Sequence, residues 1–204
     1  MAVARHPIIA NEGQFVVLTG LLVAFAVQWA YGPYAIPIWL LPILLIWIYR
    51  DPDRNIPGQP LTIVSPVDGR VMSVQLNQDP FLKREALHIV IRMSAWGVFS
   101  LRSVTEGKVM QIWQGKDKHG RCLAIWIQTD EKDDTVLVLH PGRWLKRLSW
   151  HLAYGDRIGQ GQRIGHILFG NFIDIYLPAS ARSTIKAGQK FKAGSDGIAE
   201  LMQS

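Results

Sequence analysis

The first 50 residues of the chain differ from the rest in their pattern of apolar and charged positions. Residues 13–49 contain no Asp, Glu, Lys or Arg, whereas the sequence after Arg50 alternates short apolar stretches with charged and turn-forming residues. A helix needs about 20 residues to cross a hydrocarbon core about 30 Å thick. The apolar run is therefore long enough for two short helices or one long one, and Gly32, Pro33 and Pro37 near its middle favour two.

The predicted hairpin consists of helices over residues 15–31 and 33–49, each near the lower length limit for crossing a bilayer. A hairpin that crosses twice and a re-entrant wedge in one leaflet both remain open. Arg5 precedes the run while Arg50 and Arg54 follow it, and basic residues near both ends predict that both lie in the cytoplasm. We expect an inner (cytoplasmic) membrane location, a soluble domain facing the cytoplasm, and interfacial anchoring by Trp29, Tyr31, Tyr34, Trp39, Trp47, Tyr49 and Arg50.

Two other interpretations of the apolar run have less support. A buried hairpin inside a soluble core would also lack charged residues. A cleaved signal peptide is disfavoured because the run is too long and no small-residue cleavage site precedes charged sequence.

Beyond a Pro-rich connector, residues 51–60, the sequence predicts a mainly β domain over residues 61–204. Pro52, Pro57 and Pro60 forbid a continuing helix, so the connector separates this domain from the hairpin, residues 1–50. Short stretches rich in Val, Ile and Trp, bounded by Gly, Pro or Asp, are typical of an all-β sandwich or barrel. The predicted strands are residues 62–64, 70–76, 86–93, 108–113, 122–129, 135–140, 164–169 and 172–177. Residues 86–93 have no polar face and are expected in a central position, and residues 143–151 fit either a helical turn or a strand.

Recurrent turn units add detail to this fold. Residues 66–71, 105–109 and 154–165 each place Gly beside an acidic or polar residue ahead of a β-branched one. The Gly supplies the positive φ of a tight hairpin corner. The unit resembles the turns of biotinyl and lipoyl carrier domains, but no Lys stands at the hairpin tip that a carrier modifies. The pattern predicts interlocked hairpins in a barrel-sandwich-like β domain.

The charge and the cysteine content favour a lipid surface over nucleic acid as the partner. A formal charge of +6 and a pI near 9.6 would draw the domain toward the membrane and anionic phospholipid. The basic residues are scattered and form no recognised nucleic-acid motif, so no nucleic-acid partner is expected. The single cysteine, Cys122, permits no internal disulfide, which agrees with a reducing cytoplasm.

Ordered blocks of characteristic sequence span nearly the whole chain. They are Ile9-Ala-Asn-Glu-Gly13 with Tyr49-Arg-Asp-Pro-Asp-Arg54, Val64-Ser-Pro-Val-Asp-Gly-Arg-Val71, Met93-Ser-Ala-Trp-Gly-Val-Phe-Ser-Leu-Arg-Ser103, and Gly159-Gln-Gly-Gln-Arg-Ile-Gly-His-Ile-Leu-Phe-Gly-Asn-Phe-Ile-Asp-Ile-Tyr-Leu-Pro178. Together they resemble the phosphatidylserine decarboxylase family in its short, membrane-bound bacterial and archaeal form.

The resemblance implies a self-processing lyase, but the residue at the reacting position differs. In that family a serine hydroxyl attacks the carbonyl of the preceding glycine, β-elimination breaks the chain, and a pyruvoyl group remains on the new N-terminus. The pyruvoyl forms a Schiff base with the substrate amine and accepts electrons as carbon dioxide leaves. The glycine and serine positions are Gly170 and Asn171 here. Because an Asn amide is a poor nucleophile and carries no β-oxygen, we predict no pyruvoyl cofactor.

The residues that activate the family's serine are also replaced. The resemblance implies a histidine oriented by an aspartate, the usual partners of an activated nucleophile. Asp68 stands at the aspartate position, but Phe99 stands at the histidine position. Leu101 replaces a neighbouring asparagine, Gly97 replaces an acidic residue, and the family's central polar block has no counterpart in residues 115–134. We therefore predict that the catalytic set is not intact and that Asp68 serves its turn.

Substitute chemistry has little support in the sequence. Gly194-Ser195 is a second Gly-Ser pair, but it lies downstream of the cleavage strand. Six histidines show no metal-ligand spacing, so we expect no metal and packed or solvated imidazoles at His6, His88, His119, His140, His151 and His166. The aromatic residues of the surrounding strands fit either a partner-binding surface or core packing, and they are Trp96, Phe99, Trp113 and Trp126.

The leading hypothesis is a non-catalytic member of this family. It would be a membrane-anchored β domain that binds lipid or serves as an accessory subunit of a membrane protein complex. The alternative is an active phosphatidylserine decarboxylase, a pyruvoyl lyase that forms phosphatidylethanolamine, and the membrane hairpin with Asp68 supports it. A third hypothesis is a phospholipid-presenting protein that keeps the pocket without the reaction.

Overall fold

The structure, a computed structural model, describes residues 9–59, 61–117, 120–140, 148–168 and 170–202. The chain divides into two compact units, Met1–Asp53 and Arg54–Ser204. The division falls within the predicted connector, where residues 51–59 form neither helix nor strand.

The N-terminal unit is a helical hairpin. Helix α1 (Asn11–Tyr31) ends at Gly32, whose φ of 57° lies in the left-handed region that favours glycine. The chain continues as the 3₁₀ helix η1 (Gly32–Trp39) and the helix α2 (Leu40–Ile48). The predicted break near Gly32 is present, but residues 33–49 are not one regular helix, because Pro33 and Pro37 remove N–H donors. The hairpin closes where the Ala10 N–H donates to the Tyr49 carbonyl at 2.8 Å.

Glycines in α1 allow the two arms to approach closely. A Cβ added at Gly20 would lie 2.7 Å from Leu45 Cδ1, and one added at Gly13 would lie 2.2 Å from the Tyr49 ring. Small residues at such contacts are typical of packed apolar helices. Tyr49 is only 5% exposed, because its ring packs inside the hairpin, and its role as an interfacial anchor stays a prediction.

Most of the large apolar side chains of the hairpin are uncovered. Trp29 and Tyr34 are 85% and 93% exposed. The segment Asn11–Ile48 has a mean hydropathy of 1.8 in its most apolar window, and it is long and apolar enough to cross a membrane. Its polar Gln28 is satisfied internally, accepting from Trp39 Nε1 at 3.3 Å and donating to the Gly32 carbonyl at 2.6 Å. An apolar surface with satisfied polar groups suits a lipid environment.

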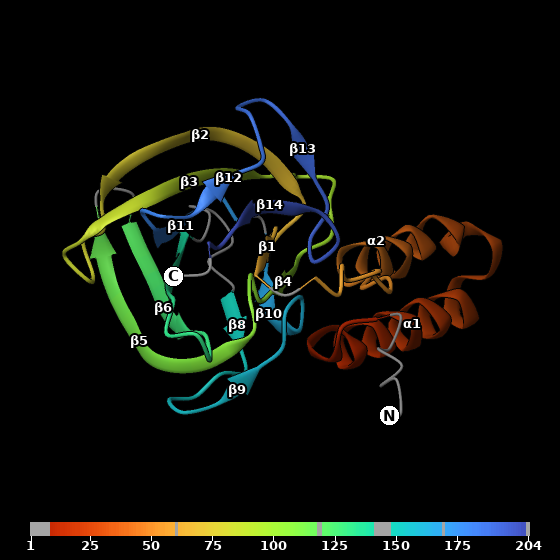
Figure 1. The fold of residues 1–204 in the computed structure, drawn as a ribbon. Helices are drawn as coiled ribbons and strands as arrows, with labels where there is room; N and C mark the ends of the chain where they lie inside the picture. The colour runs from red at the N-terminus through yellow and green to blue at the C-terminus, as the bar shows by residue number, and fades with distance from the viewer. Residues whose placement is uncertain (1–8, 60, 118–119, 141–147, 169, 203–204) are drawn as a thin grey trace. The chain divides into compact units, whose positions relative to one another are not determined.

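The second unit is built from antiparallel sheets. Eight strands in the order β13-β2-β3-β11-β7-β6-β5-β9 curl into a half-barrel (Figure 1). Two three-stranded sheets, β1-β14-β12 and β4-β10-β8, complete the described part of the unit. The strands are β1 (Thr62–Val64), β2 (Gly69–Gln78), β3 (Glu85–Met93), β4 (Ser100–Arg102), β5 (Gly107–Asp117), β6 (Gly120–Gln128), β7 (Asp134–His140), β8 (Leu148–Trp150), β9 (Arg157–Ile158), β10 (Arg163–Ile167), β11 (Phe172–Pro178), β12 (Arg182–Ser183), β13 (Lys190–Phe191) and β14 (Gly197–Glu200).

The predicted mainly β fold is confirmed, and each predicted strand has a counterpart. The strand predicted over residues 86–93 is β3, which lies in the interior of the large sheet between β2 and β11. Of the undecided segment, residues 148–150 form β8, and residues 143–147 lie outside the described residues, as does Phe169. The sequence did not predict β4, β9, β12, β13 or β14, which have two to four residues each.

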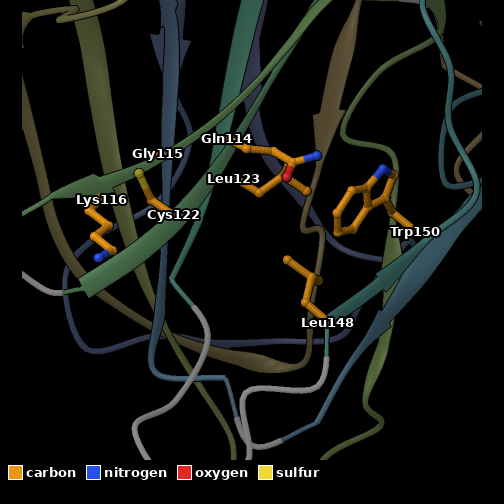
Figure 2. A pocket seen from close by; sticks show the side chains of 7 residues that line it. All are labelled: Gln114, Gly115, Lys116, Cys122, Leu123, Leu148 and Trp150. Atoms are coloured by element: carbon orange, nitrogen blue, oxygen red, sulfur yellow. The ribbon is translucent and has the colours of Figure 1, made fainter.

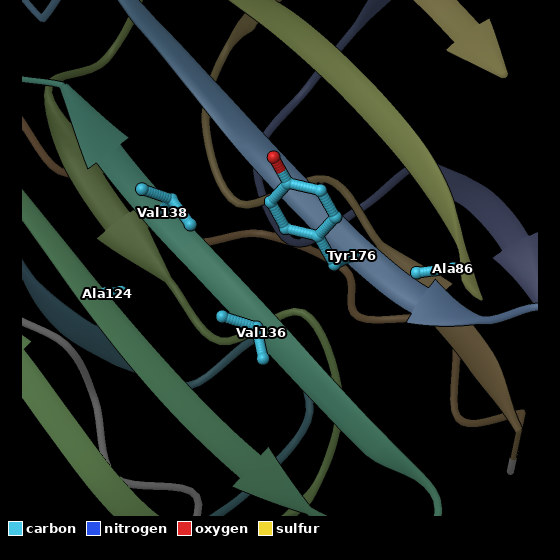
Figure 3. Close-up of a cluster of buried hydrophobic side chains, with 5 residues drawn as sticks. All are labelled: Ala86, Ala124, Val136, Val138 and Tyr176. Atoms are coloured by element: carbon cyan, nitrogen blue, oxygen red, sulfur yellow. The ribbon is translucent and has the colours of Figure 1, made fainter. Parts of the chain in front are cut away.

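The half-barrel buries side chains on both of its faces. On one face Ile89, Ile175 and Leu137 are paired across β3, β11 and β7 and are fully buried. On the other face a second buried cluster contains Ala86, Ala124, Val136, Val138 and Tyr176 (Figure 3). Trp113 and Trp126 pack against this cluster with their rings stacked 6.3 Å apart. These two tryptophans are packing residues, whereas Trp96 is 79% exposed.

Candidate functional site

Asp68, the aspartate position of the family resemblance, holds three segments of the β domain together. One guanidinium nitrogen of Arg54 lies 3.2 and 3.0 Å from its two oxygens. The backbone N–H groups of Val98 and Ala193 donate to the same carboxylate at 3.0 and 2.8 Å. A carboxylate has about four lone-pair sites, so these contacts leave little capacity to orient a histidine. In this structure Asp68 acts as a structural clamp.

The loop over residues 94–98 lies tightly against this clamp. The Ser94 N–H donates to the Asp68 carbonyl at 2.8 Å. At Gly97 an added Cβ would lie 2.6 Å from the Asp68 Cβ, closer than real Cβ contacts allow. Glycine at the position where the family has an acidic residue therefore lets the loop reach Asp68 and donate the Val98 N–H to it.

Phe99, at the histidine position, is a fully buried core residue. Its carbonyl accepts a hydrogen bond from the Ile167 N–H at 2.9 Å, which joins the end of this loop to β10. The ring of His166 lies 6.3 Å from the Phe99 ring, at an interplanar angle of 60°. A buried imidazole, His166, thus lies beside Phe99.

Gly170 and Asn171, the cleavage-pair positions, lead into β11. The Asn171 N–H donates to the His140 carbonyl at 3.1 Å, and its carbonyl accepts from the Met93 N–H at 3.2 Å. These bonds extend the pairing of β11 with β7 and β3, so the backbone at this position is fixed on both sides. The Asn171 side chain is exposed.

Asn171 opens onto a groove of about 890 Å³ over β2, β3 and β11. Its lining includes Arg92, His88, Asp174 and Tyr176. Among the described lining residues there is no serine, threonine or cysteine. The groove is wide enough for a small ligand, and the hydroxyl in its described lining is the phenol of Tyr176, not the aliphatic hydroxyl or thiol that self-processing requires.

Two histidines and one aspartate meet at the floor of this groove. His88 Nε2 lies 3.1 Å from Asp174 Oδ1, and His140 Nε2 lies 2.8 Å from Asp174 Oδ2. Tyr176 stacks on His88 with ring centroids 4.4 Å apart. Burial of Asp174 disfavours its charged form and by itself would raise its pKa. The hydrogen bonds to His140 and His88 and the positive charges of these histidines outweigh burial, so the pKa of Asp174 falls from 3.8 to about 2. The carboxylate is therefore ionised at neutral pH.

Sequence reasoning missed this histidine–aspartate cluster. His88, Asp174 and His140 belong to different strands and show no fixed spacing, and only the register of β3, β11 and β7 brings them to one face. A usable signal existed, because Asp174 is the one charged residue of β11, and His88 and His140 each directly adjoin a run of apolar residues in β3 and β7. Among the described residues, no group of three or more His, Cys, Asp or Glu side chains is placed to hold a metal ion.

The second Gly-Ser pair lies close to the Asp68 clamp but in a tight turn before β14. The Gly194 N–H donates to the Ser65 carbonyl at 2.8 Å, and Gly194 has a φ of 70°. The Ser195 N–H donates to the Lys192 carbonyl at 3.3 Å. The pair therefore serves as a turn, separate from the groove at Asn171.

A second pocket, of about 660 Å³, lies between β5, β6 and β8 (Figure 2). Leu123, Leu148 and Trp150 supply its apolar lining, and Cys122 and Lys116 lie at one side. Part of this lining falls in residues 115–134, where the family's central polar block has no counterpart, whereas Asp68, Phe99 and Asn171 do not line the pocket.

The pyruvoyl group implied by the resemblance does not fit the residues at its position. The group arises from a side chain with a β-oxygen that can leave as an ester, and Asn171 has none. Phe99 stands where the resemblance implies the activating histidine, and its hydrocarbon ring cannot accept a proton. A pyruvoyl group therefore does not fit the residue at position 171.

Comparisons with known proteins give a consistent picture. Residues 41–199 match the family model described as phosphatidylserine decarboxylase. Proteins named phosphatidylserine decarboxylase proenzyme are 35% identical in Nitrosomonas eutropha, over 96% of both chains, and 35% identical in Burkholderia ambifaria, over 97% of this chain and 98% of the relative. A protein of that name from Cupriavidus pinatubonensis is 34% identical over 96% of both chains. No solved structure matches the chain. The chain therefore belongs to the phosphatidylserine decarboxylase family.

Proposed function

We propose that this chain is a membrane-attached, phospholipid-binding member of its family that neither processes itself nor decarboxylates phosphatidylserine. It would act as a lipid-binding or accessory subunit at the cytoplasmic membrane, with the β domain facing the cytoplasm. The observation that carries the proposal is Asn171, which stands at the nucleophile position and opens onto the groove.

The residues around Asn171 support the loss of self-processing. Acyl transfer needs a hydroxyl or thiol nucleophile and a base that takes its proton. The described groove lining offers no serine, threonine or cysteine, and its imidazole, His88, is hydrogen-bonded to Asp174. Phe99 is buried hydrocarbon. Asp68 is occupied by Arg54 and two backbone N–H groups. Restoring one residue would therefore not restore the set.

The groove still offers both charges that a phospholipid headgroup requires. Arg92 makes no ion pair or side-chain hydrogen bond with another described residue, so its guanidinium is available to a phosphate or carboxylate. Asp174 is 14% exposed and ionised, and its carboxylate can accept from a headgroup ammonium. Tyr176 and Met72 supply apolar surface at the same site. This arrangement suits a zwitterionic or anionic headgroup.

An active phosphatidylserine decarboxylase is the second candidate. The names of the relatives favour it, and so does the imidazole of His166 beside Phe99. This candidate requires a nucleophile other than Asn171, or chemistry at Gly194-Ser195. The latter would release residues 195–204 and leave the groove without an electron sink.

The test is carbon dioxide release from carboxyl-labelled phosphatidylserine by the purified full chain in mixed micelles. We expect no release above a protein-free blank, and sustained turnover would overturn the proposal. Asn171→Ser alone should leave the chain whole, since Phe99 supplies no base. Asn171→Ser with Phe99→His should cleave more than the single variant. If the single variant cleaves efficiently, adding His166→Ala tests whether that imidazole is the base.

A further inference from the structure

Three cationic side chains stand directly opposite one another across neighbouring strands of the half-barrel. Lys190 of β13 pairs with Arg70 of β2, and Arg70 pairs with Arg92 of β3. Figure 1 shows these strands side by side at one end of the large sheet. Directly opposed residues of antiparallel strands share one face. We call Lys190, Arg70 and Arg92 the cationic row.

The cationic row forms no ion pair with a carboxylate among the described residues. Like charges directly opposite in a sheet are destabilising. Lys190, Arg70 and Arg92 are exposed and make no side-chain hydrogen bond or ion pair with another described residue. Elsewhere in the same unit arginines do have partners, as in the Arg54–Asp68 and Arg84–Asp134 pairs. The row is therefore an unneutralised positive strip whose repulsion an external anion would relieve.

The surroundings of the row indicate what kind of anion it meets. With strands about 4.8 Å apart, the row extends over about 10 Å, which suits several phosphates on a surface better than one phosphate ion. Met72, 51% exposed, lies beside it at the β-bulge between Val71 and Ser73. Cations beside an exposed apolar side chain are typical of membrane-surface contacts. The phosphates of a nucleic acid would also bind these cations, but they would leave the apolar Met72 side chain exposed to water.

We propose that the cationic row docks the β domain onto anionic phospholipid headgroups at the bilayer surface, with Met72 contacting the interface. The docking rests on the membrane attachment proposed above, but not on the loss of catalysis. It also places the open side of the groove, which shares Arg92 and Met72 with the row, next to the headgroups that the groove would bind.

The experiment uses the full chain in phosphatidylcholine nanodiscs with a rising fraction of phosphatidylglycerol. This anionic lipid is chosen because it is not the substrate named for the relatives, so the outcome is independent of decarboxylation. A fluorophore is attached at Met72→Cys in a Cys122→Ser background, and a fixed fraction of headgroup spin-labelled lipid reports proximity by quenching. Quenching should rise with phosphatidylglycerol and be reversed by 0.5 M salt, which shortens the range of exposed charges to a few ångströms.

Two triple variants distinguish the contribution of the cationic row from the effect of the protein's overall positive charge. Each lost cation near an anionic surface should weaken docking about fivefold, so Arg70→Gln, Arg92→Gln and Lys190→Gln together should weaken it about 100-fold. The control replaces Lys108, Lys116 and Lys132 by Gln, which removes the same charge from exposed positions on β5 and the β6–β7 turn. We expect the control to stay within about twofold of the parent. Equal loss in both variants, or no loss in the row variant, would overturn the proposal.

Two further measurements complete the test. Inorganic phosphate at 10 mM, matched in ionic strength by chloride, should not displace the domain, and displacement would assign the row to free phosphate instead. In urea, the row variant should unfold at the same or a higher denaturant concentration than the parent, because the opposed charges repel. A clear loss of stability would mean that the row is neutralised inside the folded protein, which contradicts the proposal.

Discussion

Replacing Asp174 by Asn tests the histidine–aspartate cluster at the floor of the groove. The pKa of Asp174 falls from 3.8 to about 2 because hydrogen bonds and charges of His140 and His88 outweigh its burial. One pKa unit corresponds to about 1.4 kcal/mol of differential stabilisation. The ionised carboxylate, 14% exposed, therefore contributes about 2 kcal/mol to folding, and Asp174→Asn should remove most of this amount.

The stabilisation by Asp174 should decrease as the pH is lowered. A carboxylate whose folded-state pKa lies below its unfolded value stabilises the protein fully above the unfolded pKa. For Asp174 the stabilisation is present above about pH 4 and is lost as the pH falls through about 2. The difference between the parent chain and Asp174→Asn should hold near 2 kcal/mol at pH 5 and shrink between pH 4 and pH 2.

The assay is urea unfolding of the full chain in a mild non-ionic detergent, followed by tryptophan fluorescence. Trp113 and Trp126 pack on the same face of the half-barrel as the cluster and report its unfolding. Asp133→Asn is the matched control, because burial and the charges of Glu131 and Asp134 raise the pKa of Asp133, so its removal should not destabilise the fold at pH 5. Equal stability of Asp174→Asn and the parent at pH 5 would refute the reasoning.

Three other outcomes follow from the structure. Asp68→Asn should cost about 3 kcal/mol in the same urea assay, because it breaks a largely buried charge pair and the Val98 and Ala193 contacts; Asp130→Asn, which breaks an exposed pair with Arg157, should cost less than about 1 kcal/mol. Gly97→Asp should destabilise by about 1–3 kcal/mol, since its Cβ would collide with Asp68, and a neutral result would contradict the close approach of that loop. The full chain should stay in the membrane fraction after a salt wash and be released by detergent, and unchanged attachment after deletion of residues 1–50 would rule out the hairpin as the anchor.

The sequence predicted the strands whose apolar pattern is long enough to be distinctive. β3, β7 and β11 lie within one residue of their predicted ends, because Val, Ile and Leu dominate each of them and turn-forming or charged residues bound them. β9, β12 and β13 have two residues each. Such strands carry no periodicity and exist only because a neighbouring edge offers hydrogen bonds.

The candidate site was predictable only in part, for a related reason. The family resemblance singled out Asp68, Phe99 and Asn171 in advance, since each lies in a continuous motif. The partners of Asp68 come from residues 54, 98 and 193, and the partners of Asp174 come from two other strands. Contacts between distant segments depend on register and turn geometry, which local patterns do not encode. The cationic row escaped notice because its members are 20 or more residues apart.

The intact mass of the purified full chain tests the central claim most directly. We predict one species at the mass of the unbroken 23.0 kDa chain, unchanged by borohydride with an added amine, because Asn171 cannot form the ester that precedes cleavage. Two fragments that join at residues 170 and 171, with a new N-terminal carbonyl trapped by the amine, would contradict the claim and show that the chain is a self-processing enzyme.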